Sequence, residues 1–187
     1  MVVGGGISGM AAARSLARQG YETHIIEKSS QLGGQAKNLY RTARGEDIGE
    51  KLSNLIDEIS ENDKIHVHLD TEIYHVEGFV GNFETTLSSN GDEFDLDHGV
   101  AIMATGAAPF KPDEYSYGTD DRIITALELD RKFIDNDPSI KDLNSAVFIQ
   151  CVGSRSSKRG FPYCSNICCM NTVKDTLLLR DHYPDTE

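Results

Sequence analysis

Two hydrophobic periods divide the chain, one near 3.6 residues, typical of helices, and one of two residues, typical of strands. Val2 and Val3 have the character of a strand end and lead into a glycine-rich loop. The next segment predicts a helix over residues 8–19, which Gly20 ends. An apolar strand over residues 23–27 follows, so the start of the chain predicts one βαβ unit.

A second helix and a series of strands follow this unit. Residues 46–62 carry apolar side chains at the spacing of one helix face, and their other face is acidic. From residue 64 to residue 96 the period is two, with glycine and asparagine at the turns, which predicts a strand and then an antiparallel meander. Val100 to Met103 predicts a fully buried strand. The apolar helix face consists of Ile48, Leu52, Leu55, Ile56 and Ile59.

A connector follows the last of these strands. Pro109 and Pro112 interrupt regular structure there, because proline lacks the backbone donor that helices and sheets need. Thr125 and Glu128, three residues apart, form a capping box. A short helix is therefore predicted from this point to about Phe133.

The end of the chain predicts a second unit, with an apolar strand over residues 146–150 and a helix over residues 171–182. The predicted fold class is α/β: a Rossmann-like βαβ unit with a parallel sheet, an antiparallel β-meander, and the start of a second Rossmann-like unit. Neither end resembles a domain end, so we expect a part of a longer protein. The predicted domains are residues 1–110, a connector over residues 111–145, and residues 146–187.

The glycine loop matches the pattern GxGxxG, with a strand before it and a helix after it. Gly4 would allow the tight turn, Gly6 would let a pyrophosphate approach the backbone, and Gly9 would let the helix pack closely. The helix N-terminus offers free N–H groups and a partial positive charge to that pyrophosphate. Glu27 closes the next strand and could accept hydrogen bonds from a ribose. The alternative is a glycine-rich turn with an incidental glutamate.

A second glycine pair, Gly33 and Gly34, lies just past the second predicted strand, and an Ala-Thr-Gly turn over residues 104–106 follows the meander. This order resembles the disulfide-reductase group of two-dinucleotide-domain flavoproteins, in which such a turn returns the chain to the FAD site. The resemblance implies FAD as the cofactor. The candidate cofactor-binding residues are Gly4, Gly6, Ile7, Ser8, Gly9, Glu27, Lys28, Gly33, Gly34, Thr105 and Gly106.

Charge and composition narrow the classes of partner. The chain carries 18 basic and 30 acidic side chains, a formal net charge of −12, which argues against binding to nucleic acid. No apolar run approaches the roughly 18 residues that cross a bilayer, so no transmembrane segment is predicted. The cysteines form one cluster and no disulfide framework, which favours a reducing cytoplasm.

The four cysteines stand where a second dinucleotide loop would be expected, after the strand predicted over residues 146–150. That loop lacks GxGxxG, which argues against a nicotinamide cofactor there. A helix N-terminus and nearby basic residues are expected to lower the thiol pKa values and favour thiolates. The cysteines are Cys151, Cys164, Cys168 and Cys169, and the basic residues are Arg155, Lys158 and Arg159.

Three interpretations of this cluster remain open. Four thiolates can hold a [4Fe-4S] cluster or a zinc ion, which makes all four cysteines candidate metal ligands. A redox-active thiol pair is the second interpretation, since Cys164 and Cys168 would share a helix face if the helix begins early enough. Inert buried cysteines are the third.

The cysteine stretch is the more specific part of a second resemblance, to the HdrA family of heterodisulfide reductase components. This resemblance spans nearly the whole chain. It implies an FAD-dependent oxidoreductase subunit that exchanges electrons with iron–sulfur centres, and partners that are other subunits of an electron-transfer complex, HdrB/HdrC-like or hydrogenase-like. The stretches that carry it are Cys151 to Arg155, Tyr163 to Ser165, Cys168 to Met170, Gly34 to Gly49, Val76 to Thr85 and Lys111 to Tyr115.

Two rival functions remain open. One is a thioredoxin reductase-like enzyme with a cycling cysteine pair, and the other is a non-catalytic FAD-binding assembly module. No catalytic side chain can be assigned from spacing. His66, His68 and His75 lie on predicted strands and are interpreted as solvent-facing in preference to a zinc site, and His24 is interpreted as structural.

Overall fold

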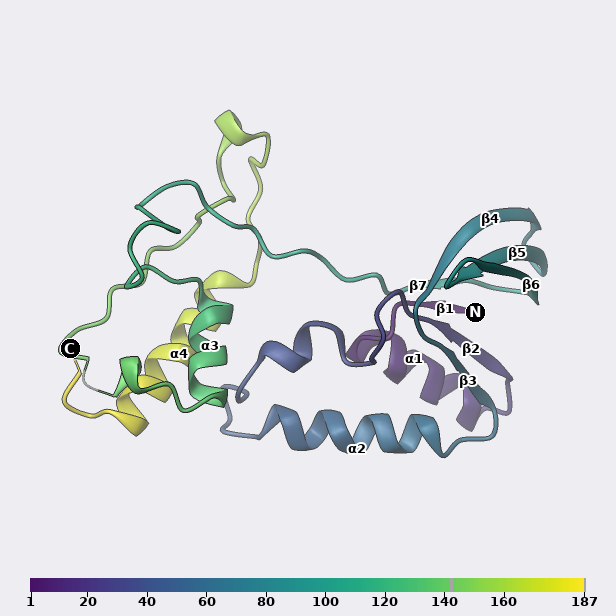
Figure 1. Cartoon of the computed structure of the whole chain (residues 1–187), viewed down its shortest axis with the longest axis horizontal. Coiled ribbons are helices and arrows are strands. Elements are labelled where there is room, and N and C mark those ends of the chain that lie inside the picture. Colours follow the sequence, from purple (N-terminus) through teal and green to yellow (C-terminus); the bar gives the residue numbers. More distant parts are fainter. Residues whose placement is uncertain (142, 187) are drawn as a thin grey trace. The chain divides into compact units, whose positions relative to one another are not determined.

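The computed structural model describes residues 1–141 and 143–186 and divides into two compact units (Figure 1). The first unit contains Met1–Lys37 and Gly49–Ala107, and the second contains Asn38–Ile48 and Ala108–Glu187. Asp142, which belongs to the predicted connector, lies outside the described residues. Among the described residues, no helix is long and apolar enough to cross a membrane.

A parallel sheet of four strands, in the order β3-β2-β1-β7, forms the centre of the first unit. Helix α1 packs against these strands, and α2 is joined to α1 by ion pairs from Arg14 and Arg18 to Glu58 (Figure 1). The side chains of Val2, Met10, Ile25 and Ile59 are fully buried. The predicted βαβ unit is therefore confirmed. The elements are β1 (Val2–Val3), α1 (Ile7–Arg18), β2 (Thr23–Ile26), α2 (Ile48–Ser60), β3 (Ile65–His68) and β7 (Ile102–Met103).

The predicted antiparallel meander is also confirmed. It consists of β4 (Thr71–Phe79), β5 (Asn82–Ser89) and β6 (Asp92–His98), in that order in one sheet. Gly78 has a φ of +96°, and a Cβ atom there would lie 2.2 Å from the carbonyl oxygen of Asn82. Backbone contact at the hairpin therefore requires glycine at this position.

The prediction of a fully buried strand from Val100 to Met103 is wrong. Strand β7 is shorter, and Val100 and Met103 are 60% and 66% exposed. The reason is its place at the edge of the sheet, where it pairs with β1 alone.

The second unit is built around two helices, α3 (Ala126–Ile134) and α4 (Cys168–His182). The predicted capping box is confirmed, because the Thr125 hydroxyl accepts a hydrogen bond from the Glu128 amide and the Glu128 carboxylate accepts one from the Thr125 amide. Helix α4 begins three residues earlier than predicted. The buried core contains Leu129, Phe133, Ile140, Leu178 and Leu179.

The strand predicted over residues 146–150 is wrong. These residues have no strand assignment, and Val147 and Ile149 are 86% and 53% exposed. A strand needs a hydrogen-bonded neighbour, and the described part of the second unit contains none for this segment.

Candidate functional site

The glycine loop is held at the end of the parallel strands by backbone contacts on two sides. The Gly4 amide donates to the Ile26 carbonyl oxygen at 2.8 Å, and the Ala104 amide donates to the Val3 carbonyl oxygen at 2.8 Å. Gly4 has a φ of +110°, and a Cβ atom there would lie 2.3 Å from the Ala104 carbonyl oxygen. The structure thus brings the turn over residues 104–106 against the loop, with Thr105 and Gly106 exposed.

Gly9 brings the first turn of α1 onto the same loop, because a Cβ atom at Gly9 would lie 1.9 Å from the Gly4 carbonyl oxygen. Gly6 is the N-cap of α1 and provides no side-chain cap. The first N–H groups of the helix therefore lack intrahelical acceptors and can bind an anion. Ile7 and Ser8, which carry two of these groups, are exposed.

Gly6 differs from its neighbours because the protein leaves space beside it. A Cβ atom at Gly6 would meet nothing closer than the Gly34 Cα atom at 4.0 Å, and its φ of −76° suits any residue. Packing within the protein therefore gives no reason for glycine here. A ligand that approaches the backbone at this point would give one.

The second glycine pair lies directly beside the first loop. The Gly33 amide donates to the Gly5 carbonyl oxygen at 2.8 Å, and Gly33 forms an isolated parallel bridge with Gly6. A Cβ atom at Gly34, whose φ is +53°, would lie 3.1 Å from the Gly6 Cα atom. The structure therefore brings the two predicted glycine segments together.

The Glu27 carboxylate connects the loop to the end of β2. It is buried and accepts hydrogen bonds from the Gly5 amide at 2.6 Å and from the Ser29 amide at 2.8 Å. Burial alone would raise the pKa of Glu27, but the hydrogen bonds from Ser29 and Gly5 outweigh it and hold the pKa below its usual value. Each carboxylate oxygen has a second lone pair, so an ionised Glu27 retains acceptor capacity for a hydroxyl group.

Sequence reasoning missed two residues at this site. A Cβ atom at Gly5 would lie 2.5 Å from Leu32 Cδ2 and 3.0 Å from Glu27 Oε2, so the middle glycine of the loop is required by packing. Lys37 follows the second glycine pair in a 3₁₀ helix, and its charge contributes to the low pKa of Glu27. The basic residue predicted here, Lys28, is exposed. The one signal for Lys37 in the sequence is its position three residues after Gly34.

The four cysteines lie in the second unit, in the segment from residue 151 to the start of α4, and none is in a disulfide. Cys151 has a φ of +61° in a turn, and Cys168 and Cys169 are the first two residues of α4. Cys164 precedes the helix, and its sulfur accepts the Asn166 amide at 3.4 Å. Cys164 and Cys168 therefore do not share a helix face.

The thiols at the start of α4 differ in pKa. The pKa of Cys168 is lowered, first by a hydrogen bond from the Cys151 amide and then by the Ser165 hydroxyl, 3.7 Å from its sulfur. The pKa of Cys169 is raised, chiefly by negative charge on Cys168 and further by Cys151 and Cys164. The thiols are thus close enough to affect one another.

The expectation that nearby basic residues and a helix N-terminus lower all the thiol pKa values is wrong. Cys169 shifts in the opposite direction, and the causes at Cys168 are hydrogen bonds. The Arg159 guanidinium is engaged elsewhere, at 2.7 Å from Glu114 and in a second ion pair with Asp113.

Comparison with known proteins agrees with the fold of the first unit. Residues 2–52 match the family described as NAD(P)-binding Rossmann-like domain. The crystal structure of L-proline dehydrogenase from P. horikoshii superposes with a TM-score of 0.50 at 21% identity, over 56% of this chain and 22% of that chain. This likeness confirms the predicted α/β fold class.

Two curated relatives match the whole chain, and both are HdrA-type iron-sulfur subunits of CoB–CoM heterodisulfide reductase. The relative from Methanocaldococcus jannaschii is 28% identical over 276 residues, and one from Methanopyrus kandleri is 26% identical over 276 residues. The chain spans 42% of the length of each. The aligned stretch is longer than this chain of 187 residues, so the relatives carry additional segments within it.

Proposed function

Because this chain is homologous over its whole length to the HdrA-type component of heterodisulfide reductase, we propose that it is the FAD-binding part of an oxidoreductase subunit that transfers electrons between flavin and iron–sulfur centres. The chain covers 42% of its relatives, so the activity of the whole protein belongs to this proposal. Its partners are other subunits of an electron-transfer complex, HdrB/HdrC-like or hydrogenase-like.

The observation that carries the proposal is the open space beside Gly6. Gly4, Gly5 and Gly9 face protein atoms within 3.0 Å of a Cβ position, whereas Gly6 faces none closer than 4.0 Å and lies next to the free amides of α1. A diphosphate fits this arrangement because it needs bare backbone and N–H donors on one side. The residues present therefore fit a dinucleotide cofactor.

The protein groups have distinct roles in this proposal. The amides of Ile7, Ser8 and Gly9 donate to the pyrophosphate, and Glu27 accepts from the adenosine ribose. Gly33 and Gly34 let the cofactor approach the second segment of backbone. The bound flavin would supply the redox chemistry, while the chain binds and orients it.

The four cysteines suit an iron–sulfur centre by their donor chemistry, since thiolates are the usual ligands of such centres. The charge coupling of Cys169 to the other three thiols supports a shared site. We therefore propose that Cys151, Cys164, Cys168 and Cys169 hold a [4Fe-4S] cluster. Free clustered thiols also suit a reducing compartment, so the proposal includes a cytoplasmic location.

A second candidate function rests on the low pKa of Cys168. A thiol with a lowered pKa is a better nucleophile near neutral pH, and Cys164 lies four residues before it. This observation favours a redox-active pair of the thioredoxin reductase type. The two candidates differ in iron content.

The test is purification of this chain and of its full-length parent without oxygen, followed by flavin absorbance and by iron and sulfide analysis. Bound flavin together with iron and sulfide in equal amounts supports the proposal. Flavin without iron, with two thiols fewer after oxidation, supports the thiol pair. A full-length parent with neither flavin nor iron would contradict both.

A further inference from the structure

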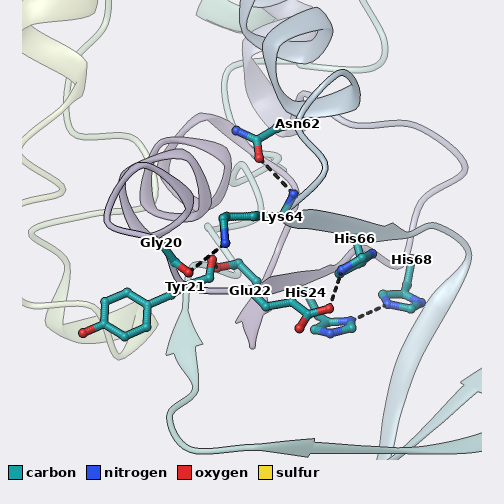
Figure 2. Close-up of polar contacts among 9 residues, drawn as sticks. Gly20, Tyr21, Glu22, His24, Asn62, Lys64, His66 and His68 are labelled. Carbon is teal, nitrogen blue, oxygen red and sulfur yellow. Dashed lines mark hydrogen bonds and ion pairs between the residues drawn. The ribbon is translucent and has the colours of Figure 1, made fainter.

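Three histidines and a glutamate gather on two neighbouring parallel strands of the first unit, at a distance along the chain from the glycine loop (Figure 2). His24 lies opposite His66 in the register of β2 and β3, and His68 lies two residues further along β3. Side chains two residues apart on a strand point to the same face, so these three imidazoles share one face of the sheet. Glu22 precedes β2.

The distances within this group suit one small cation. The ligand atoms of Glu22, His24 and His66 all lie within 4.8 Å of one another, and Glu22 Oε1 is 2.8 Å from His66 Nε2. Three ligands bound to one tetrahedral zinc ion at 2.0–2.1 Å would lie about 3.3 Å apart. Among the residues that the structure describes, this is the one group of three histidine, cysteine or carboxylate ligands with such spacing.

His68 orients the ring of His24. The His24 Nδ1 and His68 Nε2 atoms are 3.0 Å apart, so one nitrogen donates a hydrogen bond to the other (Figure 2). His68 also packs against the ring of Phe94 at 5.5 Å, which limits its rotation. Metal-bound histidines commonly have their second ring nitrogen fixed by such a hydrogen bond.

The backbone around the group is held by separate contacts. The Thr23 amide donates to the Lys64 carbonyl oxygen at 2.8 Å, and the Lys64 ammonium donates to the Gly20 carbonyl oxygen at 3.1 Å (Figure 2). The strands that carry the ligands are therefore in register without a metal. The site is pre-formed, which reduces the free-energy cost of binding.

Protonation favours metal binding at His24. Burial lowers the pKa of His24, and the neighbouring His66 and His68 lower it further. A neutral imidazole has the free lone pair that a metal needs, so this ring does not have to lose a proton at neutral pH. Glu22 is 71% exposed and provides the negative charge that the imidazoles lack.

We propose that Glu22, His24 and His66 form a binding site for a divalent transition-metal ion of the zinc type, with His68 as a positioning residue. Two imidazoles and one carboxylate suit zinc, nickel or copper in preference to calcium or magnesium, which favour oxygen ligands. A fourth position would be left to water. Because β3 is the edge strand of the sheet, the ion would crosslink this edge to β2.

Cobalt(II) is the probe that separates this site from the cysteines. Thiolate ligands give cobalt an intense charge-transfer band in the near ultraviolet, whereas imidazole and carboxylate ligands do not. The chain, prepared metal-free and without a histidine tag, is titrated with cobalt under reducing conditions and then with zinc in competition. We expect one equivalent of bound cobalt that has no charge-transfer band, in addition to any bound by thiolates.

Four variants test the ligands. His66→Ala and Glu22→Gln should lose the equivalent without a charge-transfer band, and His68→Gln should weaken zinc binding by about 10- to 100-fold. His75→Ala is the matched control, because its imidazole is 63% exposed on β4 and lies outside the group. Glu22→Gln keeps the test decisive if His66→Ala does not fold, since Glu22 is exposed.

The outcome that overturns the proposal is equally definite. Cobalt bound by thiolates alone, or unchanged cobalt binding in Glu22→Gln and His66→Ala, would rule out this site. Zinc should also raise the thermal midpoint of the wild type and of His75→Ala, and leave that of Glu22→Gln unchanged. Flavin content is not a readout here, so the result is independent of the proposed function.

Discussion

A Cβ atom on Gly9 would lie 1.9 Å from the carbonyl oxygen of Gly4. The contact joins the first turn of α1 to the turn that ends β1, and neither backbone segment can withdraw without loss of its hydrogen bonds to the sheet. Gly9 is therefore required by the fold itself. Gly6, three residues earlier, has no such neighbour.

The first prediction concerns this contact. Gly9→Ala should lower the free energy of unfolding by about 1 to 3 kcal/mol, because the added methyl group overpacks the junction of loop and helix. Urea unfolding followed by circular dichroism measures the change. Wild-type stability in Gly9→Ala would mean that the loop is not packed as described.

The second prediction separates cofactor binding from folding. Gly6→Val should cost about 1 kcal/mol of stability or less, since the protein leaves room for the side chain, yet it should abolish flavin retention by filling the space of the diphosphate. The ratio of flavin to protein absorbance measures retention.

Gly99→Val is the matched control for Gly6→Val. The same side chain is added in the first unit, where the nearest atoms to a Cβ lie 3.8 Å away, and this variant should keep its flavin. Full flavin occupancy in Gly6→Val would contradict the assignment of the loop.

Local sequence signals predicted the first unit well because its rules are local. The GxGxxG loop, the apolar period of α2 and the alternation in β4 to β6 each depend on residues close in sequence. Gly5 was missed because its requirement comes from Leu32 and Glu27, which are brought to it by the fold.

The second unit was predicted less well, for a related reason. Residues 146–150 have the composition of a strand, but strand formation depends on a neighbour that the segment does not have among the described residues. The thiol pKa values likewise depend on which partners the fold brings to each sulfur. Arg159 is close to the cysteines in sequence, yet its charge is engaged with Asp113 and Glu114.

The third prediction concerns a buried charge cluster in the second unit. The Lys174 ammonium forms ion pairs with Asp130 and with Asp175, the latter at 3.0 Å, and both carboxylates are fully buried. Burial raises the pKa of Asp175 from 3.8 to about 6, against the opposing effect of Lys174. The folded state therefore holds this proton more tightly than the unfolded state does.

The sign of the pH dependence follows from that shift. The contribution of Asp175 to stability is complete below its ordinary pKa of 3.8 and is lost as the pH rises through about 6. Asp175→Asn removes the titration, so its stability relative to the wild type should increase as the pH rises through this range. Urea unfolding of both proteins on either side of the folded pKa measures the difference, and a constant difference would contradict the assignment.

The fourth prediction concerns the order of thiol alkylation. Near neutral pH, iodoacetamide should modify Cys168 before Cys169, because the pKa of Cys168 is lowered and that of Cys169 is raised. Peptide mass spectrometry after short exposures gives the two rates. Ser165→Ala should narrow the difference, since it removes a hydroxyl that stabilises the Cys168 thiolate. Faster modification of Cys169, the more exposed of the two, would show that access outweighs thiolate content.

The fifth prediction dissociates the two proposed cofactors. Cys164 is exposed and its sulfur accepts one backbone hydrogen bond, so Cys164→Ala should leave the fold and the flavin content intact while iron and sulfide fall to background. Gly6→Val should show the reverse, with iron retained and flavin lost. Ser165→Ala serves as the neighbouring control and should retain both. Equal iron in Cys164→Ala and the wild type would exclude Cys164 as a ligand, and parallel loss of flavin and iron in both variants would indicate unfolding, because the two sites share no residue.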